Sequence, residues 1–192
     1  STLFPYTTLF RSWFCVVGCV AVSFRMDRLM EVRRLTIADL AEYRALHRYG
    51  MIEAPLAIVD TAESDAARSD EAVAEVLKRG DAWGVFLETR MVGKLAIDAL
   101  PYPSLAHTFW VHAVYVHPDG RGSGASTALM RAAIEGARER GASRVALWVN
   151  GENTHAHRLY ERLGFRESGR IPGGIFVGGK QCDDVLMSLV LV

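Results

Sequence analysis

The most constraining feature of this sequence is a strand-like run that passes through a glycine-rich turn into an amphipathic helix. Thr108–Val116 is β-branched and aromatic, and Pro118 stops it. The turn His117–Ser126 holds three glycines, and Ser126–Arg140 carries apolar side chains on one face and charged ones on the other. Free N–H groups and the helix dipole make such a junction an anion site. The alternative is a turn whose glycines serve only local sterics.

Two common phosphate-binding motifs do not fit this turn. The Gly-Lys-Ser/Thr ending of a P-loop is absent, which argues against ATP or GTP hydrolysis. In the dinucleotide spacing, Gly122 and Gly124 fit, but Thr127 stands where the last glycine belongs. The next strand also ends at Val149-Asn150 without an acidic residue.

The rest of the chain alternates between strand and helix patterns. Strands are expected over 31–35, 83–87, 91–98, 108–116, 144–149, 165–168 and 185–190, and helices after Asp39 and over 70–79, 126–140 and 153–163. This order indicates one mixed α/β domain.

Two motifs carry a family resemblance. Val116-x-Pro118-x-x-Arg121-Gly122-x-Gly124-x-Ser126 resembles the acetyl-CoA pyrophosphate loop of the GNAT acetyltransferase family, although Ser126 departs from the usual Gly or Ala. Leu147-Trp148-Val149-Asn150, followed by Asn153-x-x-Ala156-x-x-Leu159-Tyr160-x-x-Leu163-Gly164-Phe165, resembles the family's later strand and helix. The resemblance covers roughly residues 32–190.

The resemblance implies a fold and an activity. The fold is a single-domain GNAT fold: a mixed, mostly antiparallel sheet splayed at its central strands, with flanking helices. The activity is transfer of an acetyl group from acetyl-CoA to a primary amine of a small molecule or a protein, directly within a ternary complex. The alternatives are a non-catalytic acyl-CoA-binding module of the same fold and, from residues 11–23 alone, an exported or lipid-anchored binding protein.

The resemblance also implies the catalytic residues. Tyr160 would donate a proton to the leaving thiolate, and the competing interpretation is a core tyrosine. His112 would accept the proton of the amine or orient a water that does so, and the competing interpretation is a structural histidine. Strand alternation places Trp110, His112 and Val114 on one face and Tyr115 on the other.

Coenzyme A would be held mainly by backbone groups. The N–H of Val114 would contact the thioester carbonyl, and the backbone of Val116 would lie along coenzyme A. Asn153 would bind the pantetheine arm or cap its own helix. The remaining candidates are the consecutive residues Arg121, Gly122, Ser123, Gly124, Ala125 and Ser126.

The acceptor pocket is expected from the first two helices, the loop Ala99–His107 and the segment Gly169–Asp184. Three aromatic residues are candidates for its lining: Trp83, Tyr102 and Trp110. No metal site is expected: no HExxH motif is present, and His155 and His157 do not share a helix face. His47, His107 and His117 are interpreted as surface or loop residues, and Cys182 as a loop residue.

Composition bears on partners and location. Lys+Arg and Asp+Glu are both 22, so the formal net charge is zero and nucleic-acid binding is not expected. The three cysteines form no disulfide or metal pattern, which fits a cytoplasmic protein. No stable membrane association is expected, and a homodimer is left open.

Residues 1–30 differ from the rest. Between Ser1 and Phe24 only Arg11 is charged, and an apolar run follows it that is too short for a membrane span of about 20 residues. The segment is interpreted as a leader that is either non-native, since Pro5–Ser12 resembles translated sequencing adapter, or signal-like. Residues 31–192 are assigned to the GNAT domain.

Overall fold

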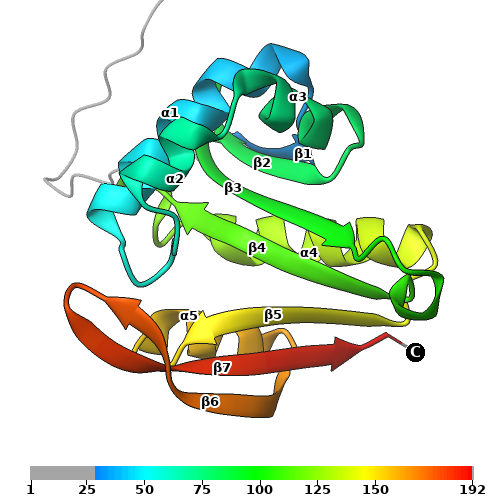
Figure 1. The fold of residues 1–192 in the computed structure, drawn as a ribbon. Coiled ribbons are helices and arrows are strands. Elements are labelled where there is room, and N and C mark those ends of the chain that lie inside the picture. Colours follow the sequence, from blue (N-terminus) through cyan, green and yellow to red (C-terminus); the bar gives the residue numbers. More distant parts are fainter. Residues whose placement is uncertain (1–28, 192) are drawn as a thin grey trace, which may run out of the picture.

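The structure, a computed structural model, describes residues 29–191, so residues 1–28 of the expected leader 1–30 lie outside the described residues. Its centre is a seven-stranded sheet with the order β1-β2-β3-β4-β5-β7-β6 (Figure 1). All neighbouring strands pair antiparallel except β4 and β5, which are parallel. The strands are β1 (Met30–Arg34), β2 (Ala82–Leu87), β3 (Arg90–Ala99), β4 (Thr108–Val116), β5 (Arg144–Asn150), β6 (Arg166–Val177) and β7 (Lys180–Val190). The expected mixed, mostly antiparallel sheet is confirmed.

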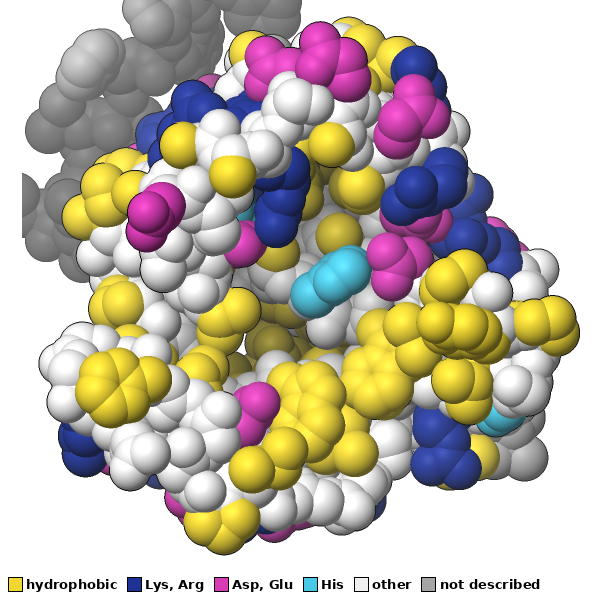
Figure 2. Space-filling model, viewed as in Figure 1, with side chains coloured by type: hydrophobic (Ala, Val, Ile, Leu, Met, Phe, Trp, Pro, Cys, Tyr) yellow, Lys and Arg dark blue, Asp and Glu magenta, His cyan; other side chains and the backbone are white. Residues whose placement is uncertain are grey.

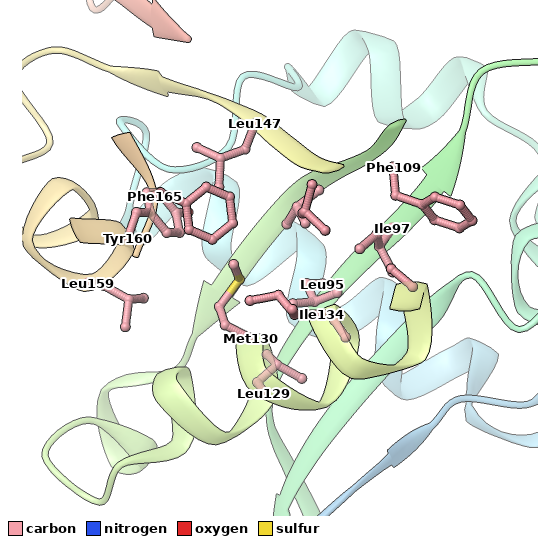
Figure 3. Packing of buried hydrophobic residues seen from close by; sticks show 14 of the residues in the cluster. Leu95, Ile97, Phe109, Leu129, Met130, Ile134, Leu147, Leu159, Tyr160 and Phe165 are labelled. Carbon is pink, nitrogen blue, oxygen red and sulfur yellow. The ribbon is translucent and has the colours of Figure 1, made fainter. Parts of the chain in front are cut away.

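Helices cover both faces of the sheet (Figure 1). They are α1 (Leu40–Glu53), α2 (Ala62–Ala67), α3 (Asp70–Lys78), α4 (Ala125–Glu139) and α5 (Thr154–Arg162), with short 3-10 turns η1 (Ile37–Asp39), η2 (Pro103–Leu105) and η3 (Pro118–Gly120). The larger core lies under α4 and α5, where Leu129, Met130 and Phe165 are completely buried (Figure 3). A second core lies under α1 and α3, around Leu46, Leu77 and Tyr115.

The sheet opens between β4 and β5. Only Thr108, Phe109 and Trp110 of β4 pair with β5, and the rest of β4 has no strand partner on that side among residues 29–191. The two halves therefore diverge toward the end of β4 that precedes the glycine turn (Figure 1). The predicted splay of the central strands is confirmed, and it leaves backbone groups of β4 available to a ligand.

The structure departs from the expected secondary structure at α2 and at the closing hairpin. The helix α2 was not predicted, although Thr61 caps it by accepting a hydrogen bond from the Ser64 amide. β6 and β7 form one long hairpin rather than two short closing strands. The register of β6 shifts between Ile171 and Ile175, around Pro172 and two glycines that hide the strand pattern in the sequence.

Candidate active site

A cavity of about 1280 Å³ fills the opening between the two halves of the sheet. Figure 2 shows the hollow, with hydrophobic side chains along its lower wall and charged side chains along its upper rim. One wall comes from β4 and the segment after α1, and the other from β5 and α5. Eight of the predicted site residues line it: His112, Val114, Val116, Arg121, Gly122, Ser126, Asn153 and Tyr160.

The glycine turn lies at one end of this cavity and leads into α4. Gly122 and Gly124 have φ angles of 76° and 87°, in the left-handed region, and at either position an added Cβ would meet no atom of the described residues within 4 Å. The glycines are therefore required by backbone conformation and not by crowding. Gly124 is the N-cap of α4 and gives no side-chain cap to the first-turn amides, which suits them to a phosphate.

Only some of the residues predicted in the glycine turn line the cavity. The Ser123 hydroxyl donates to the Gly120 carbonyl at 2.7 Å and accepts from the Ala125 amide at 3.3 Å. Ala125 is buried in the core. Ser123, Gly124 and Ala125 do not line the cavity among the described residues, so they shape the turn next to it.

Arg121 has an acidic partner that the sequence did not reveal. Its guanidinium donates to the Val116 carbonyl at 3.2 Å and to Glu53, at the end of α1. Glu53 also accepts from the Tyr115 hydroxyl at 2.9 Å. The Arg121 guanidinium and then the Tyr115 hydroxyl hold the pKa of Glu53 below its usual value.

A bulge in β4 corrects the expected side-chain alternation. His112 pairs with Ala96 and Tyr115 pairs with Lys94, so two residues of β4 oppose one residue of β3. The extra residue is accommodated at Ala113, whose φ is 53°. Tyr115 therefore joins the core under α1 and α3, on the face that His112 shares, whereas Val114 packs on the opposite core. The prediction that Tyr115 points away from His112 was wrong.

His112 lies on the β4 wall of the cavity with about half of its side chain exposed, at 52%. Its Nε2 is 3.6 Å from a carboxylate oxygen of Asp98 on β3. Partial desolvation lowers the pKa of His112 below 6.5, and the Asp98 carboxylate opposes this shift. A neutral imidazole near neutral pH is suited to accept a proton.

Tyr160 projects from α5 toward the same cavity and is 6% exposed. Its ring lies against Phe165, with centroids 5.8 Å apart (Figure 3). Within residues 29–191 no hydrogen bond or charge shifts its pKa, and burial alone raises it. The hydroxyl is thus protonated at physiological pH and is available to a ligand. The core interpretation agrees with the structure, because Tyr160 belongs to the larger buried core, and its role as the proton donor stays a prediction.

Two asparagines line the β5–α5 wall. Asn153 caps α5, since its side-chain oxygen accepts from the Ala156 amide at 3.1 Å. Asn150, which the sequence analysis did not select, is 4% exposed at the end of β5. Its side-chain Nδ2 is buried without a hydrogen-bond partner in the described part of the chain. An unpaired buried donor beside a cavity is a place for a ligand acceptor.

The acceptor side of the cavity differs in part from the expectation. Trp110 lines this side, as predicted. The first helices were also expected to contribute, and the lining includes the segment after α1, Arg68 and part of α3. Of the segment Gly169–Asp184, Ile175 and Asp184 take part. In the described structure, neither Trp83 nor Tyr102 lines it. Trp83 packs instead against Gly136 of α4, and Tyr102 is 59% exposed.

Two further placements in the sequence analysis were wrong. His47 is 4% exposed, and its Nε2 lies 3.1 Å from Asp60, because α1 packs that side of the helix on the sheet. Cys182 is a buried residue of β7 and not a loop residue. Residues 29–191 contain no group of three or more His, Cys, Asp or Glu side chains arranged to hold a metal ion.

The fold and the cavity agree with a family assignment. The model of the acetyltransferase (GNAT) family matches residues 52–165. The chain belongs to this family.

Relatives with curated descriptions match shorter segments. An uncharacterized N-acetyltransferase of Methanocaldococcus jannaschii is 48% identical over 63 residues, which are 33% of this chain and 28% of that protein. A mycothiol acetyltransferase of Thermobispora bispora is 47% identical over 55 residues, 29% of this chain and 19% of that protein. The chain thus spans less than a third of the length of these relatives.

Solved structures match along most of the chain. A ribosomal-protein-alanine N-acetyltransferase from Brucella melitensis has a TM-score of 0.73 and 25% identity, and the match covers 84% of this chain and 99% of that one. A putative acetyltransferase from Salmonella typhimurium, solved with its cofactor acetyl-CoA, has a TM-score of 0.74 and 20% identity over 85% and 95% of the two chains. The second likeness concerns the fold alone. In residues 29–191, no helix has the length and apolarity that a membrane crossing requires.

Proposed function

We propose that the chain is an acetyl-CoA-dependent N-acetyltransferase that acts on a primary amine in a ternary complex. The observation that carries the proposal is that His112, Tyr160 and the glycine turn line one cavity between separated strands. The proposed location is the cytoplasm. Whether two copies assemble is a question for a measurement of molecular mass in solution.

The cavity suits coenzyme A in three respects. Left-handed Gly122 and Gly124 let the turn approach a diphosphate without a Cβ, and Arg121 adds a cation. The unpaired Nδ2 of Asn150 offers a donor to an amide carbonyl of the pantetheine arm. Within the described structure, β4 beyond Trp110 has no strand partner on the cavity side, which leaves backbone groups near Val114 for the thioester. When bound, acetyl-CoA supplies an activated acetyl group.

His112 and Tyr160 then divide the proton transfers. The neutral imidazole of His112 accepts the proton that the amine loses as its nitrogen bonds to the carbonyl carbon. The Tyr160 hydroxyl donates a proton to the sulfur when the carbon–sulfur bond breaks. His112 then releases its proton to solvent and Tyr160 regains one from solvent, so that the net change moves one proton from the amine to the leaving thiol.

The acceptor proposed for this site is a primary amine with an apolar portion. Asp98, beside His112, is the carboxylate that would receive the ammonium form of the amine before its deprotonation. Apolar side chains of Tyr43, Val73 and Trp110 line the same side of the cavity and would cover the rest of the acceptor.

The test combines turnover with binding. The purified chain is mixed with acetyl-CoA and a panel of primary amines, from polar to apolar, and free thiol is measured. Turnover that rises with the apolar area of the amine, and a raised KM for amine in Asp98→Asn, are expected. If coenzyme A binds but no amine is acetylated, the chain is a non-catalytic acyl-CoA-binding module.

A further inference from the structure

A buried lysine adjoins the cavity wall without lining the cavity. Lys94 of β3 is 0% exposed and is among the largest of the completely buried side chains in the described part of the chain. Its side chain lies between the sheet and α1, with the ammonium 4.6 Å from the centroid of the Tyr43 ring. A buried ammonium is costly unless it is paired, and an apolar side chain of similar volume is often at least as stable there.

The hydrogen bond of Lys94 is directed at the backbone of the cavity wall. Its Nζ donates to the carbonyl of Ala113 at 3.3 Å. Within the described residues, no carboxylate forms an ion pair with it, and Asp60 and Asp65 act only through longer-range attraction. Desolvation lowers the pKa of Lys94 to about 7. The titratable or charged groups around it come from α1, the α1–α3 segment and β4: Tyr43, His47, Asp60, Asp65, Arg68, His112 and Tyr115.

Ala113 is where β4 needs external support. Its φ of 53° is one of two positive values at non-glycine residues in the described structure. A left-handed alanine is strained, so the surroundings must hold it in place. The bulge at this residue separates His112, which faces Asp98, from Val114, which packs on the opposite core. Without the bulge, plain alternation would place these two side chains on one face.

We propose that Lys94 is a positioning residue: its ammonium holds the Ala113 carbonyl and thereby fixes the bulge that aims His112 and the backbone of Val114 at the reacting groups. The inference rests on the proposed acetyl transfer, because His112 and Val114 have these roles only there. Lys94 acts through the backbone and does not touch the substrate.

The test variant is Lys94→Met, which keeps the volume and removes the donor. Its melting temperature is expected to equal or exceed that of the wild type, because a buried charge is removed. Affinity for coenzyme A is expected to stay unchanged, while kcat falls by about tenfold to a hundredfold. The Ala113 and Val114 amide signals in an NMR spectrum are expected to shift. Leu95→Met, next to it on β3 and facing the opposite core, is the matched control and keeps kcat.

A second substitution separates positioning from plain structural damage. Glycine adopts positive φ without strain, so Ala113→Gly added to Lys94→Met is expected to recover much of the lost kcat. If Lys94→Met fails to fold, Lys94→Leu, which also removes the donor, takes its place in both comparisons.

Three results would overturn the assignment: a kcat within about twofold of the wild type, unshifted Ala113 and Val114 signals, or a fall in kcat matched by equal losses of stability and coenzyme A affinity. The two proposals fail separately. A wild type that acetylates no amine would refute the proposed function, whereas the NMR comparison tests the Lys94–Ala113 contact without turnover.

Discussion

The carboxylate of Glu53 accepts a 2.5 Å hydrogen bond from the guanidinium of Arg121, 68 positions later in the chain. This contact joins the end of α1, on the acceptor side of the cavity, to the glycine turn that we assign to the diphosphate. It holds the side chain of Arg121 near Val116, and it also means that Arg121 must share its charge between Glu53 and a bound phosphate.

Replacing Arg121 by Ala is expected to weaken coenzyme A binding by about tenfold, because one charge-assisted hydrogen bond is lost. Isothermal titration with coenzyme A measures the effect. Glu53→Gln is the control, since it keeps the cation and the acceptor for Tyr115, and its affinity is expected to equal or exceed that of the wild type. Unchanged affinity in Arg121→Ala would remove this residue from the binding site.

Gly124 and Gly141 form a matched pair for testing the turn. Their φ angles are 87° and 84°, and an added Cβ would meet nothing within 4 Å at either position. Alanine should therefore cost about 1–2 kcal/mol of stability in each case through backbone strain alone. Only Gly124→Ala is expected to weaken coenzyme A binding as well, because Gly124 caps α4 beside the cavity. Chemical denaturation and ligand titration measure the two effects, and equal affinities in both variants would contradict the assigned role of the turn.

Tyr160→Phe is expected to lower kcat by about a hundredfold, because it removes the proton donor for the thiolate. Its melting temperature should change little, since the hydroxyl has no hydrogen-bond partner among the described residues. Tyr102→Phe, an exposed tyrosine away from the cavity, serves as the control. Full activity of Tyr160→Phe at every pH would show that another group protonates the sulfur.

The pH dependence of kcat/KM tests His112. The base must be neutral, and its pKa is lowered from 6.5, so activity should persist as the pH falls through 6.5 and decline only below it. The Asp98 carboxylate raises the pKa of His112, so Asp98→Asn should move the decline to still lower pH. His112→Gln should lower activity and abolish this decline. A decline that persists in His112→Gln would assign the base to another residue.

Local sequence patterns were sufficient to predict the strands and helices that carry the two motifs. β4 has the predicted bounds, and α4 begins one residue before the prediction. These patterns work because hydrophobic periodicity, glycine at chain reversals and Asn153 as a cap act over a few neighbouring residues.

The bulge at Ala113 shows where such patterns stop. Alternation along β4 predicts a side for each side chain, but the extra residue reverses the sides from Val114 onward. Alanine, unlike glycine, does not indicate a positive φ in a sequence. The conformation of Ala113 depends on packing against β3 and on the contact of its carbonyl with Lys94. The burial of His47 has a similar cause, since its partner Asp60 belongs to the segment after α1.

The sequence by itself therefore determined the order of strands and helices, the glycine turn and the family resemblance, because each depends on residues close together in the chain. The tertiary structure decided which side chains meet: Glu53 with Arg121, His112 with Asp98, and Lys94 with the Ala113 backbone. Those contacts join residues 14 to 68 positions apart and exist only after the strands have paired in their observed register.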